Sequence, residues 1–342
     1  MKIAFFDTKQ YDKTTFAKAN KNGHEFNFIT QGLSVKTAEL AKGSEAICAF
    51  VNCDGSREVL EKLAAQGIKY WFQRSAGYNR IDLKAAEELG IKVFRVPAYS
   101  PEAVCEFAMT LLMSLNRNIH LAHNRVTNNN FSLNGLEGET IFGKTIGVIG
   151  AGRIGQGFIK IANGLGAKVV VYDEYAQNNF PQTAEALGFT YLSKEEVFAQ
   201  ADFLSIHAPL LPSTKYIVNK DTLALMKPSA IIVNTARGPL INTEDLLEAL
   251  DNGKLRGAGL DVYENEAGVF FFDKSNEVIS DSLLTRLRAH RNVILTSHQA
   301  FFTNLALEQI ATTTTNNIEL AIKKEDGTTR LILQEDGKVI NG

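Results

Sequence analysis

The stretch of residues 143–173 constrains the fold more than any other part of this chain. A short apolar, β-branched run leads into the pattern G-x-G-x-x-G, formed by Gly150, Gly152 and Gly155, which is followed by helical spacing and a second strand-like run ending at Asp173. The three glycines suit a tight turn, a close approach of backbone amides to a pyrophosphate, and close helix–strand packing. A helix N-terminus also attracts phosphate charge. The sequence therefore predicts a dinucleotide-binding βαβ unit.

Asp173 stands at the end of the second strand of this unit. A carboxylate there can accept hydrogen bonds from the adenosine ribose hydroxyls and would repel a 2′-phosphate, which favours NAD over NADP. The alternative is a glycine turn in an unrelated α/β protein. The order of strand, turn, helix, strand and acidic residue favours the cofactor.

Length and composition limit the class of protein. A chain of 342 residues predicts two domains. A net charge of −2 gives no reason to expect nucleic acid or a membrane surface as a partner, and no apolar run is long enough to span a membrane. The three cysteines, Cys48, Cys53 and Cys105, lack a metal-binding spacing, so we expect no metal. Their odd number predicts reduced thiols and a cytoplasmic location.

Residues 1–99 alternate between strand and helix patterns, which predicts a parallel sheet with helices on its faces. The predicted strands cover 2–7, 24–30, 46–51, 68–73 and 92–96, and the helices 11–20, 56–66 and 82–89. The turn Arg74–Tyr78 directly follows a strand. Its amides either form an anion-binding nest or belong to an ordinary turn containing Gly77.

A strong helix start at Ser100-Pro101-Glu102 opens the second part of the chain. The helical pattern runs to about Asn124 and is a candidate hinge between domains, and a polar loop over 128–139 follows. Counting from Thr145, six strands alternate with helices and predict a doubly wound sheet. The four later strands cover 201–207, 230–235, 257–262 and 292–296, and the helices 219–226, 242–252 and 282–290.

Three polar residues, Arg237, Asp261 and His298, lie at or just after the carboxyl ends of separate strands. Ligands of such sheets bind beyond these ends, so the three residues converge on the edge predicted for the cofactor. A guanidinium can grip a carboxylate or polarise a ketone oxygen, and a histidine can donate a proton to that oxygen. This convergence is the main argument for catalysis.

A histidine acid works better beside a carboxylate. Asp261, Glu264 and Glu266 are all close in sequence, and the residues alone do not choose among them. A metal site built from His298 and these acids has no paired histidines to support it. His207 also stands at a carboxyl edge, where it either contacts the cofactor or packs within the strand.

Five motifs carry a resemblance to a known family. They are VIGAGRIGQ at 148–156, HAPLLPST at 207–214, NTARGPLI at 234–241, GLDVYENE at 259–266 and TSHQAF at 296–301. With these motifs the chain resembles the D-2-hydroxyacid dehydrogenases over nearly its whole length, most of all the fermentative D-lactate dehydrogenases.

The resemblance implies a role for each catalytic residue. Arg237 would bind the substrate carboxylate and carbonyl, Glu266 would pair with His298, and His298 would be the acid/base. Asp261 would be a cofactor-site residue that also tunes the pair. The implied contacts to NAD are Gly150, Gly152, Arg153, Ile154, Gly155, Asp173, His207, Ala208, Pro209, Thr214, Thr235, Ala236, Arg237 and Asp261.

The family also implies a substrate site and an architecture. Ser75, Ala76 and Gly77 would bind the substrate carboxylate through their amides, and Tyr99 and Phe301 would wall a small apolar pocket beside Arg237 and His298. Two doubly wound α/β domains would flank an active-site cleft. A flavodoxin-like substrate domain would comprise 1–99 and 299–342, and a Rossmann NAD-binding domain 100–298. Two or four copies would form a homodimer or homotetramer.

The implied activity is reduction of pyruvate to D-lactate with NADH. Closure of the two domains would exclude water from this reaction. Three alternatives remain at this point. The first is an enzyme for a bulkier 2-keto acid. The second is a D-3-phosphoglycerate dehydrogenase, disfavoured because only about 40 residues follow His298. The third is a non-catalytic NAD(H) sensor. The run Phe270–Phe272 could be a plug between domains, an oligomer contact or core.

Overall fold

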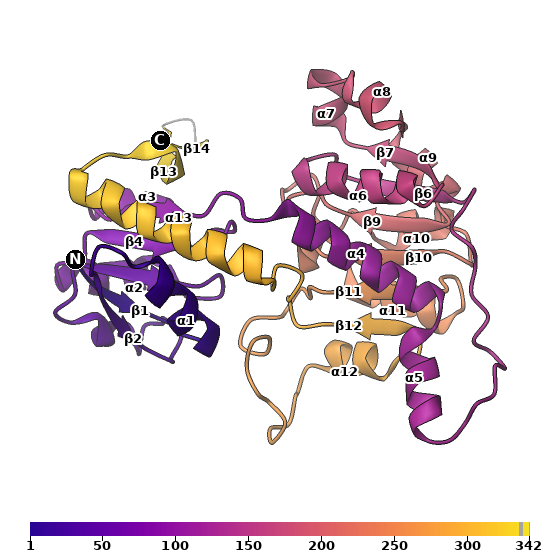
Figure 1. The fold of residues 1–342 in the computed structure, drawn as a ribbon, viewed down its shortest axis with the longest axis horizontal. Coiled ribbons are helices and arrows are strands. Elements are labelled where there is room, and N and C mark those ends of the chain that lie inside the picture. Colours follow the sequence, from indigo (N-terminus) through magenta and orange to yellow (C-terminus); the bar gives the residue numbers. More distant parts are fainter. Residues whose placement is uncertain (335–337, 342) are drawn as a thin grey trace. The chain divides into compact units, whose positions relative to one another are not determined.

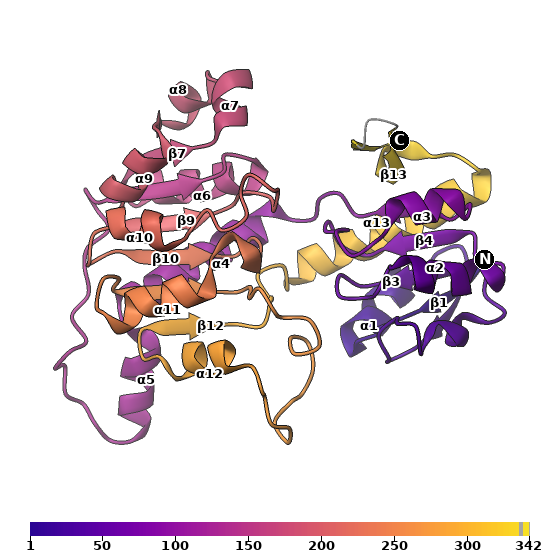
Figure 2. The ribbon, with the colours of Figure 1, turned by 180° about the vertical axis from the view of Figure 1, so that it is seen from behind.

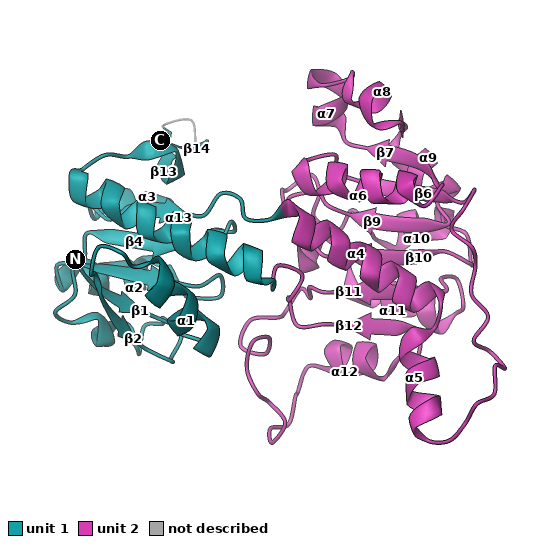
Figure 3. Cartoon of the chain, in the orientation of Figure 1, with its two compact units in different colours: residues 1–100, 302–342 teal, residues 101–301 magenta. Residues whose placement is uncertain are grey.

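The computed structural model describes residues 1–334 and 338–341. Contacts divide the chain into two compact units, residues 1–100 with 302–342 and residues 101–301 (Figure 3). The sequence placed these limits at 99/100 and 298/299. The limits differ because the Ser100 amide binds Gln309 within the first unit, whereas the amides of Gln299 and Ala300 bind Asp261 within the second.

The first unit is a seven-stranded sheet in the order β14-β13-β5-β4-β3-β1-β2 (Figure 1). Its strands are β1 (Lys2–Phe5), β2 (Glu25–Phe28), β3 (Ala46–Ala49), β4 (Tyr70–Gln73), β5 (Lys92–Arg95), β13 (Arg330–Leu333) and β14 (Val339–Asn341). Its helices are α1 (Gln10–Ala19), α2 (Arg57–Ala65), α3 (Leu83–Glu88) and α13 (Asn304–Lys323), with 3-10 turns η1 (Ala38–Ala41) and η3 (Gly327–Thr329). The strands β1 to β5 are parallel, as the sequence predicted.

Helices α1 and α13 cover one face of this sheet, and α2 and α3 the other (Figures 1 and 2). Phe16 of α1 and Ile318 of α13 pack with Phe5 and Phe72 in one core cluster. The antiparallel edge formed by β13 and β14 was not anticipated. Its strands are short, and β13 pairs with β5 through only two residue pairs, so no periodic pattern marks them in the sequence.

The second unit is a seven-stranded parallel sheet in the order β12-β11-β10-β9-β6-β7-β8. Its strands are β6 (Thr145–Ile149), β7 (Lys168–Tyr172), β8 (Thr190–Tyr191), β9 (Phe203–Ile206), β10 (Ile231–Asn234), β11 (Gly257–Leu260) and β12 (Val293–Leu295). Its helices are α4 (Pro101–Asn116), α5 (Ile119–Thr127), α6 (Arg153–Gly164), α7 (Glu174–Asn179), α8 (Thr183–Leu187), α9 (Lys194–Gln200), α10 (Lys220–Leu225), α11 (Thr243–Asp251) and α12 (Ser282–Ala289), with the 3-10 turn η2 (Gly238–Leu240). Six of these strands were predicted, and the two-residue edge strand β8 was not.

Two apolar clusters lie on the two faces of this sheet. One cluster includes Leu112 of α4 and Phe158 of α6. The other includes side chains of α9, α11 and α12, namely Phe198, Leu247 and Leu284. The strand order reverses between β6 and β9. Such a reversal is where doubly wound sheets bind their ligands.

A half-buried carboxylate, Asp202, lies just before β9 at the amino-terminal end of this sheet. It accepts hydrogen bonds from the Thr145 amide at 2.8 Å and from the Lys227 ammonium at 2.8 Å. Burial alone would raise the pKa of Asp202, but these two hydrogen bonds outweigh it and hold the pKa below its usual value.

The helix predicted from Pro101 to about Asn124 is broken. It ends at Asn116, because Asn118 adopts a left-handed backbone (φ 51°) before α5 begins. The Asn116 side chain donates to the Glu139 carbonyl and accepts from the Glu139 amide, while Arg256 donates to the Asn116 carbonyl. These contacts satisfy the helix end, although the apolar spacing in the sequence continues through it. Within the described ranges, no helix has the length and apolarity needed to cross a membrane.

Candidate active site

The glycine turn lies where the sheet of the second unit reverses. Gly150 has a left-handed backbone (φ 97°), and a Cβ there would lie 2.7 Å from the Ala208 nitrogen. A Cβ on Gly155 would lie 2.0 Å from the Gly150 oxygen. Around Gly152, at the helix N-terminus, a Cβ would meet nothing within 4 Å. Two glycines are therefore needed for packing, and the third leaves open space for a ligand's phosphates beside the start of α6.

Asp173 has a further task that the sequence did not indicate. One carboxylate oxygen accepts from the Ala151 amide at 2.8 Å, and the other caps α7 through the Ala176 amide at 2.9 Å. The side chain thus fastens the glycine turn to the end of β7. Each carboxylate oxygen retains capacity for a second hydrogen bond.

Buried polar atoms without partners stand at the ends of β9 and β10. Among the described residues, neither His207 Nδ1 nor Thr235 Oγ1 has a hydrogen-bond partner. The His207 Nε2 atom lies 2.9 Å from the Ser205 hydroxyl, and burial lowers the pKa of His207 to about 3, so this imidazole is neutral. Buried polar groups normally find partners, so these two atoms fit a bound polar ligand such as NAD. The Thr214 hydroxyl instead donates to the Pro209 carbonyl and shapes its own loop.

Arg237 follows β10 and is half-buried. Its Nη1 donates to the Ala236 carbonyl at 2.7 Å. No other residue in the described ranges accepts a hydrogen bond from this guanidinium, so its remaining donors can bind a ligand. The next residue, Gly238, passes very close to the backbone of Tyr263, since a Cβ there would lie 2.1 Å from the Tyr263 carbonyl carbon. Arg237 is thus held against the loop that follows β11.

Asp261 is fully buried and organises the chain around His298. Its carboxylate accepts from the Thr296 hydroxyl at 2.6 Å and from the amides of Gln299 and Ala300 at 2.8 Å each. Its carbonyl accepts from the His298 amide at 2.7 Å. Burial raises the pKa of Asp261 despite these hydrogen bonds. The role of Thr296 had no signal in the sequence beyond its place before His298.

The structure pairs His298 with Glu266. The His298 Nδ1 atom lies 2.8 Å from Glu266 Oε1, and both side chains are largely buried. Glu266 Oε2 also accepts from the Tyr263 amide. Glu264, in contrast, binds the Tyr216 hydroxyl and the Thr243 amide. The three acids that the sequence left open therefore have three different surroundings.

The middle residue of the run 270–272 also lies against His298. The Phe271 and His298 rings are 5.7 Å apart between centroids and tilted by 35°. Both residues have a left-handed backbone, with φ of 69° and 55°. Such backbone costs on the order of 1–3 kcal/mol for a non-glycine residue and is found mostly at functional sites. Phe270 is buried in the core of the second unit, and Phe272 is exposed.

The predicted substrate residues divide between the units. Phe301 is buried in the second unit, whereas Ser75, Ala76 and Gly77 follow β4 in the first, which also holds the half-buried Tyr99.

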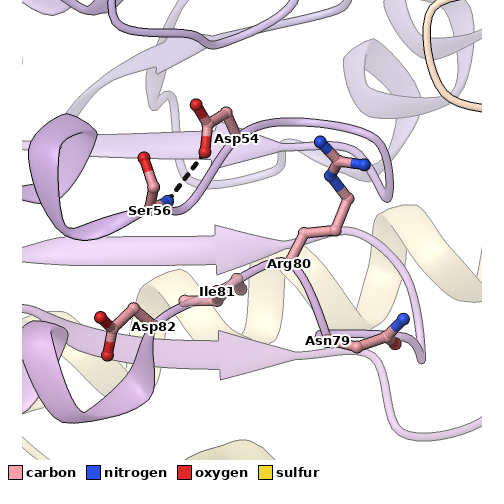
Figure 4. Close-up of a pocket in the computed structure, with 6 residues that line it drawn as sticks. All are labelled: Asp54, Ser56, Asn79, Arg80, Ile81 and Asp82. Carbon is pink, nitrogen blue, oxygen red and sulfur yellow. Dashed lines mark hydrogen bonds between the residues drawn. The ribbon is translucent and has the colours of Figure 1, made fainter.

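The first unit also has a pocket of about 330 Å³, lined by Asp54, Ser56, Asn79, Arg80, Ile81 and Asp82 (Figure 4). None of the predicted site residues lines it. No cluster of three metal-ligating His, Cys, Asp or Glu side chains occurs in the part of the chain that is described.

Comparison with known proteins identifies the family of this chain. Residues 109–300 match the family described as D-isomer specific 2-hydroxyacid dehydrogenase, NAD binding domain. The chain is 47% identical to D-lactate dehydrogenase of Escherichia coli over 326 residues, which cover 95% of this chain and 98% of the relative.

Solved structures match the whole fold. The apo-structure of the Escherichia coli D-lactate dehydrogenase superposes with a TM-score of 0.88 at 44% identity, covering 97% of this chain and 100% of that one. A D-lactate dehydrogenase with NAD+ from Lactobacillus jensenii matches with a TM-score of 0.77 at 33% identity, covering 95% of this chain and 98% of that one.

The chain therefore belongs to the D-isomer specific 2-hydroxyacid dehydrogenases, a family of NAD-dependent oxidoreductases. Its second unit is the NAD-binding domain of that family, and the prediction of NAD as cofactor is confirmed. The predicted fold class, with two parallel-sheet α/β domains, is confirmed as well.

Proposed function

We propose that this protein is an NAD-dependent D-lactate dehydrogenase that reduces pyruvate to D-lactate. The observation that carries the proposal is the contact of 2.8 Å between His298 Nδ1 and Glu266 Oε1, at the edge of the sheet where Arg237 also lies. The likeness to D-lactate dehydrogenases over nearly the whole chain supports this substrate. The D configuration of the product rests on the family's D-isomer specificity.

The proton chemistry follows from the histidine pair. With Nδ1–H donating to Glu266, the other ring nitrogen, Nε2, is the one that faces substrate and donates its proton to the carbonyl oxygen. The carboxylate fixes the orientation of the ring. In lactate oxidation the same nitrogen takes the proton back. NAD(H), when bound, supplies or accepts the hydride at the substrate carbon.

The remaining residues bind and orient substrate in this proposal. Arg237 grips the carboxylate and polarises the carbonyl with its forked donors. The amides of Ser75, Ala76 and Gly77 supply further donors to the carboxylate. Tyr99 and Phe301 supply the apolar walls that limit the substrate to a small side chain.

The cofactor contacts follow the glycine turn and the ends of the neighbouring strands. Gly150, Gly152 and Gly155, with Arg153 and Ile154 at the start of α6, would hold the pyrophosphate. Asp173 would bind the adenosine ribose through its remaining acceptor capacity. The residues after β9, β10 and β11 would line the rest of the cofactor site: His207, Ala208, Pro209, Thr214, Thr235, Ala236, Arg237 and Asp261.

The assay is oxidation of NADH at 340 nm with pyruvate as substrate, followed by chiral chromatography of the product. We expect pyruvate-dependent oxidation, D-lactate as the product, and a higher kcat/KM for pyruvate than for 2-oxoisocaproate. Absence of pyruvate-dependent oxidation, or L-lactate as the product, would contradict the proposal. A higher kcat/KM for the branched substrate would keep the chemistry and change the substrate class.

We also propose that the protein self-associates through an exposed apolar surface. The segment formed by α5 and the loop after it exposes Val126, Phe131, Leu133 and Phe142, each at least half accessible. An apolar group of this kind on one segment is typical of an interaction site. We expect a homodimer or homotetramer formed through this segment, which light scattering would detect. We also propose a reducing cytoplasmic location, with which the three free cysteines agree. Reoxidation of NADH by pyruvate would give the enzyme a role in fermentation.

A further inference from the structure

The turn after β4 satisfies all of its carbonyl groups inside the protein. The Ser75 carbonyl accepts from the Val96 amide at 3.3 Å, and the Ala76 carbonyl accepts from Arg95 Nη1 at 3.0 Å. The Gly77 carbonyl accepts from the Ser75 hydroxyl at 2.9 Å. None of the residues in the described ranges accepts a hydrogen bond from the amides of residues 75–78.

This asymmetry has a geometric cause. In a trans peptide, the N–H points away from the C=O of the same unit. Three carbonyls turned towards the protein therefore direct the following amides, those of Ala76, Gly77 and Tyr78, towards the other side. Buried or half-buried backbone donors without acceptors need a partner. Amides presented together in this way suit an anion.

A chain of buried hydrogen bonds locks the turn from behind. The Trp71 indole N–H donates to Gln73 Oε1 at 2.9 Å, and Gln73 Nε2 donates to the Ser75 hydroxyl at 2.8 Å and to the Gly77 carbonyl at 3.3 Å. The indole can only donate, so the oxygen of the Gln73 amide must face it and the NH2 group must face the turn. The orientation of Gln73 is thereby unambiguous.

Arg95 adds a positive charge at the same place. Its guanidinium donates to Ala76 and Asn341 and lies 5.1 Å from the centre of the Tyr78 ring. Within the described part of the chain it forms no ion pair with a carboxylate. The neighbouring Arg74, by contrast, is buried beside the carboxylate of Asp12. The charge of Arg95 therefore remains available to a bound anion.

We propose that Gln73 and Arg95 are positioning residues for the substrate carboxylate: Gln73 locks the turn 75–78 with its amides turned outward, and Arg95 adds a fixed positive charge behind it. The inference rests on the proposed function, since it takes the anion to be the carboxylate of a 2-keto acid. The site then needs no rearrangement when substrate binds, which is how preorganised donors gain affinity.

The test measures binding of oxamate, an unreactive analogue of pyruvate, to the enzyme–NADH complex, together with the KM and kcat for pyruvate. Gln73→Leu should weaken oxamate and raise KM about tenfold with kcat within about twofold, the effect of losing one or two hydrogen bonds. Gln73→Glu should weaken oxamate more than Gln73→Leu does, because it places a negative charge behind the amides. Arg95→Met should act in the same direction.

Two further variants separate positioning from a general loss of structure. Gln66→Leu also removes a glutamine that donates two hydrogen bonds to backbone carbonyls of the first unit, and it should leave oxamate binding unchanged. Combining Gln73→Leu with Ser75→Ala should cost no more than the larger single change, because both break one relay.

The outcomes are decisive in either direction. Oxamate affinity that is unchanged in Gln73→Leu and Arg95→Met, or a fall in kcat with KM constant, overturns the inference while the wild-type reductase activity stands. Equal effects of Gln73→Leu and Gln66→Leu overturn it as well. A wild type that neither reduces pyruvate nor binds oxamate overturns the proposed function first, and this inference with it.

Discussion

The Glu266–His298 pair allows a prediction with a defined size. Glu266→Gln keeps the shape of the side chain and an oxygen that can accept from His298 Nδ1, but it removes the negative charge 2.8 Å away. Two unit charges about 4 Å apart interact by about 4 kcal/mol at an effective dielectric of 20. Part of this remains as the neutral hydrogen bond. We therefore expect the variant to lose about 1.5–3 kcal/mol of the electrostatic stabilisation that the carboxylate gives to proton transfer through His298.

The assay is kcat/KM for pyruvate reduction at about pH 7, measured from the oxidation of NADH. A difference of about 1.36 kcal/mol corresponds to a tenfold change in rate, so kcat/KM should be about 10- to 100-fold lower in Glu266→Gln than in the wild type.

Glu264→Gln is the matched control. It removes the same charge from the same loop, but Glu264 contacts Tyr216 and Thr243. Its kcat/KM should stay close to that of the wild type. The reasoning is refuted if Glu266→Gln has an unchanged kcat/KM, or if the two variants lower it equally.

Three further predictions concern the second unit. Arg237→Lys should lower kcat/KM for pyruvate at least 100-fold, because an ammonium cannot replace the forked donors; steady-state kinetics with unchanged values would contradict this. Gly155→Ala should lower the melting temperature of the protein alone, since its Cβ would lie 2.0 Å from the Gly150 oxygen. Gly152→Ala should leave that temperature unchanged but weaken NADH binding, measured by fluorescence titration; a reversed order of the two variants would be inconsistent with the proposed phosphate site. Asp202→Asn should lower the free energy of unfolding by about 1 kcal/mol at pH 7. Since the folded pKa of Asp202 lies below the unfolded value, its stabilisation is present above about pH 4 and is lost as pH falls through the folded pKa, so urea unfolding should show the gap closing in acid.

Much of the fold could be predicted from local patterns in the sequence. The glycine turn predicted the βαβ unit because its three glycines answer to steric demands within one short segment. Polar residues after strands predicted the edge of the sheet, since parallel strands end at the same side. Arg237 and His298 were predicted as site residues in this way.

Features that depend on distant partners were not predictable. The break at Asn118 depends on contacts of Asn116 with Glu139 and Arg256, and β13 is a strand because β5 lies beside it. The residues alone offered three acids for His298. The family resemblance implied Glu266, and the course of the loop after β11 places this residue beside His298. Gln73 had one unused signal, a polar residue at the last position of a buried strand.

The division of the first unit between both ends of the chain has a consequence for biosynthesis. Its five parallel strands leave the ribosome first, but α13, which covers one of their faces, follows only after the 201 residues of the second unit. At bacterial to eukaryotic elongation rates this is a delay of about 10–40 s. During that interval Phe5, Phe16 and Phe72 lack their covering helix, so the nascent first unit is the part of the protein most in need of chaperone protection.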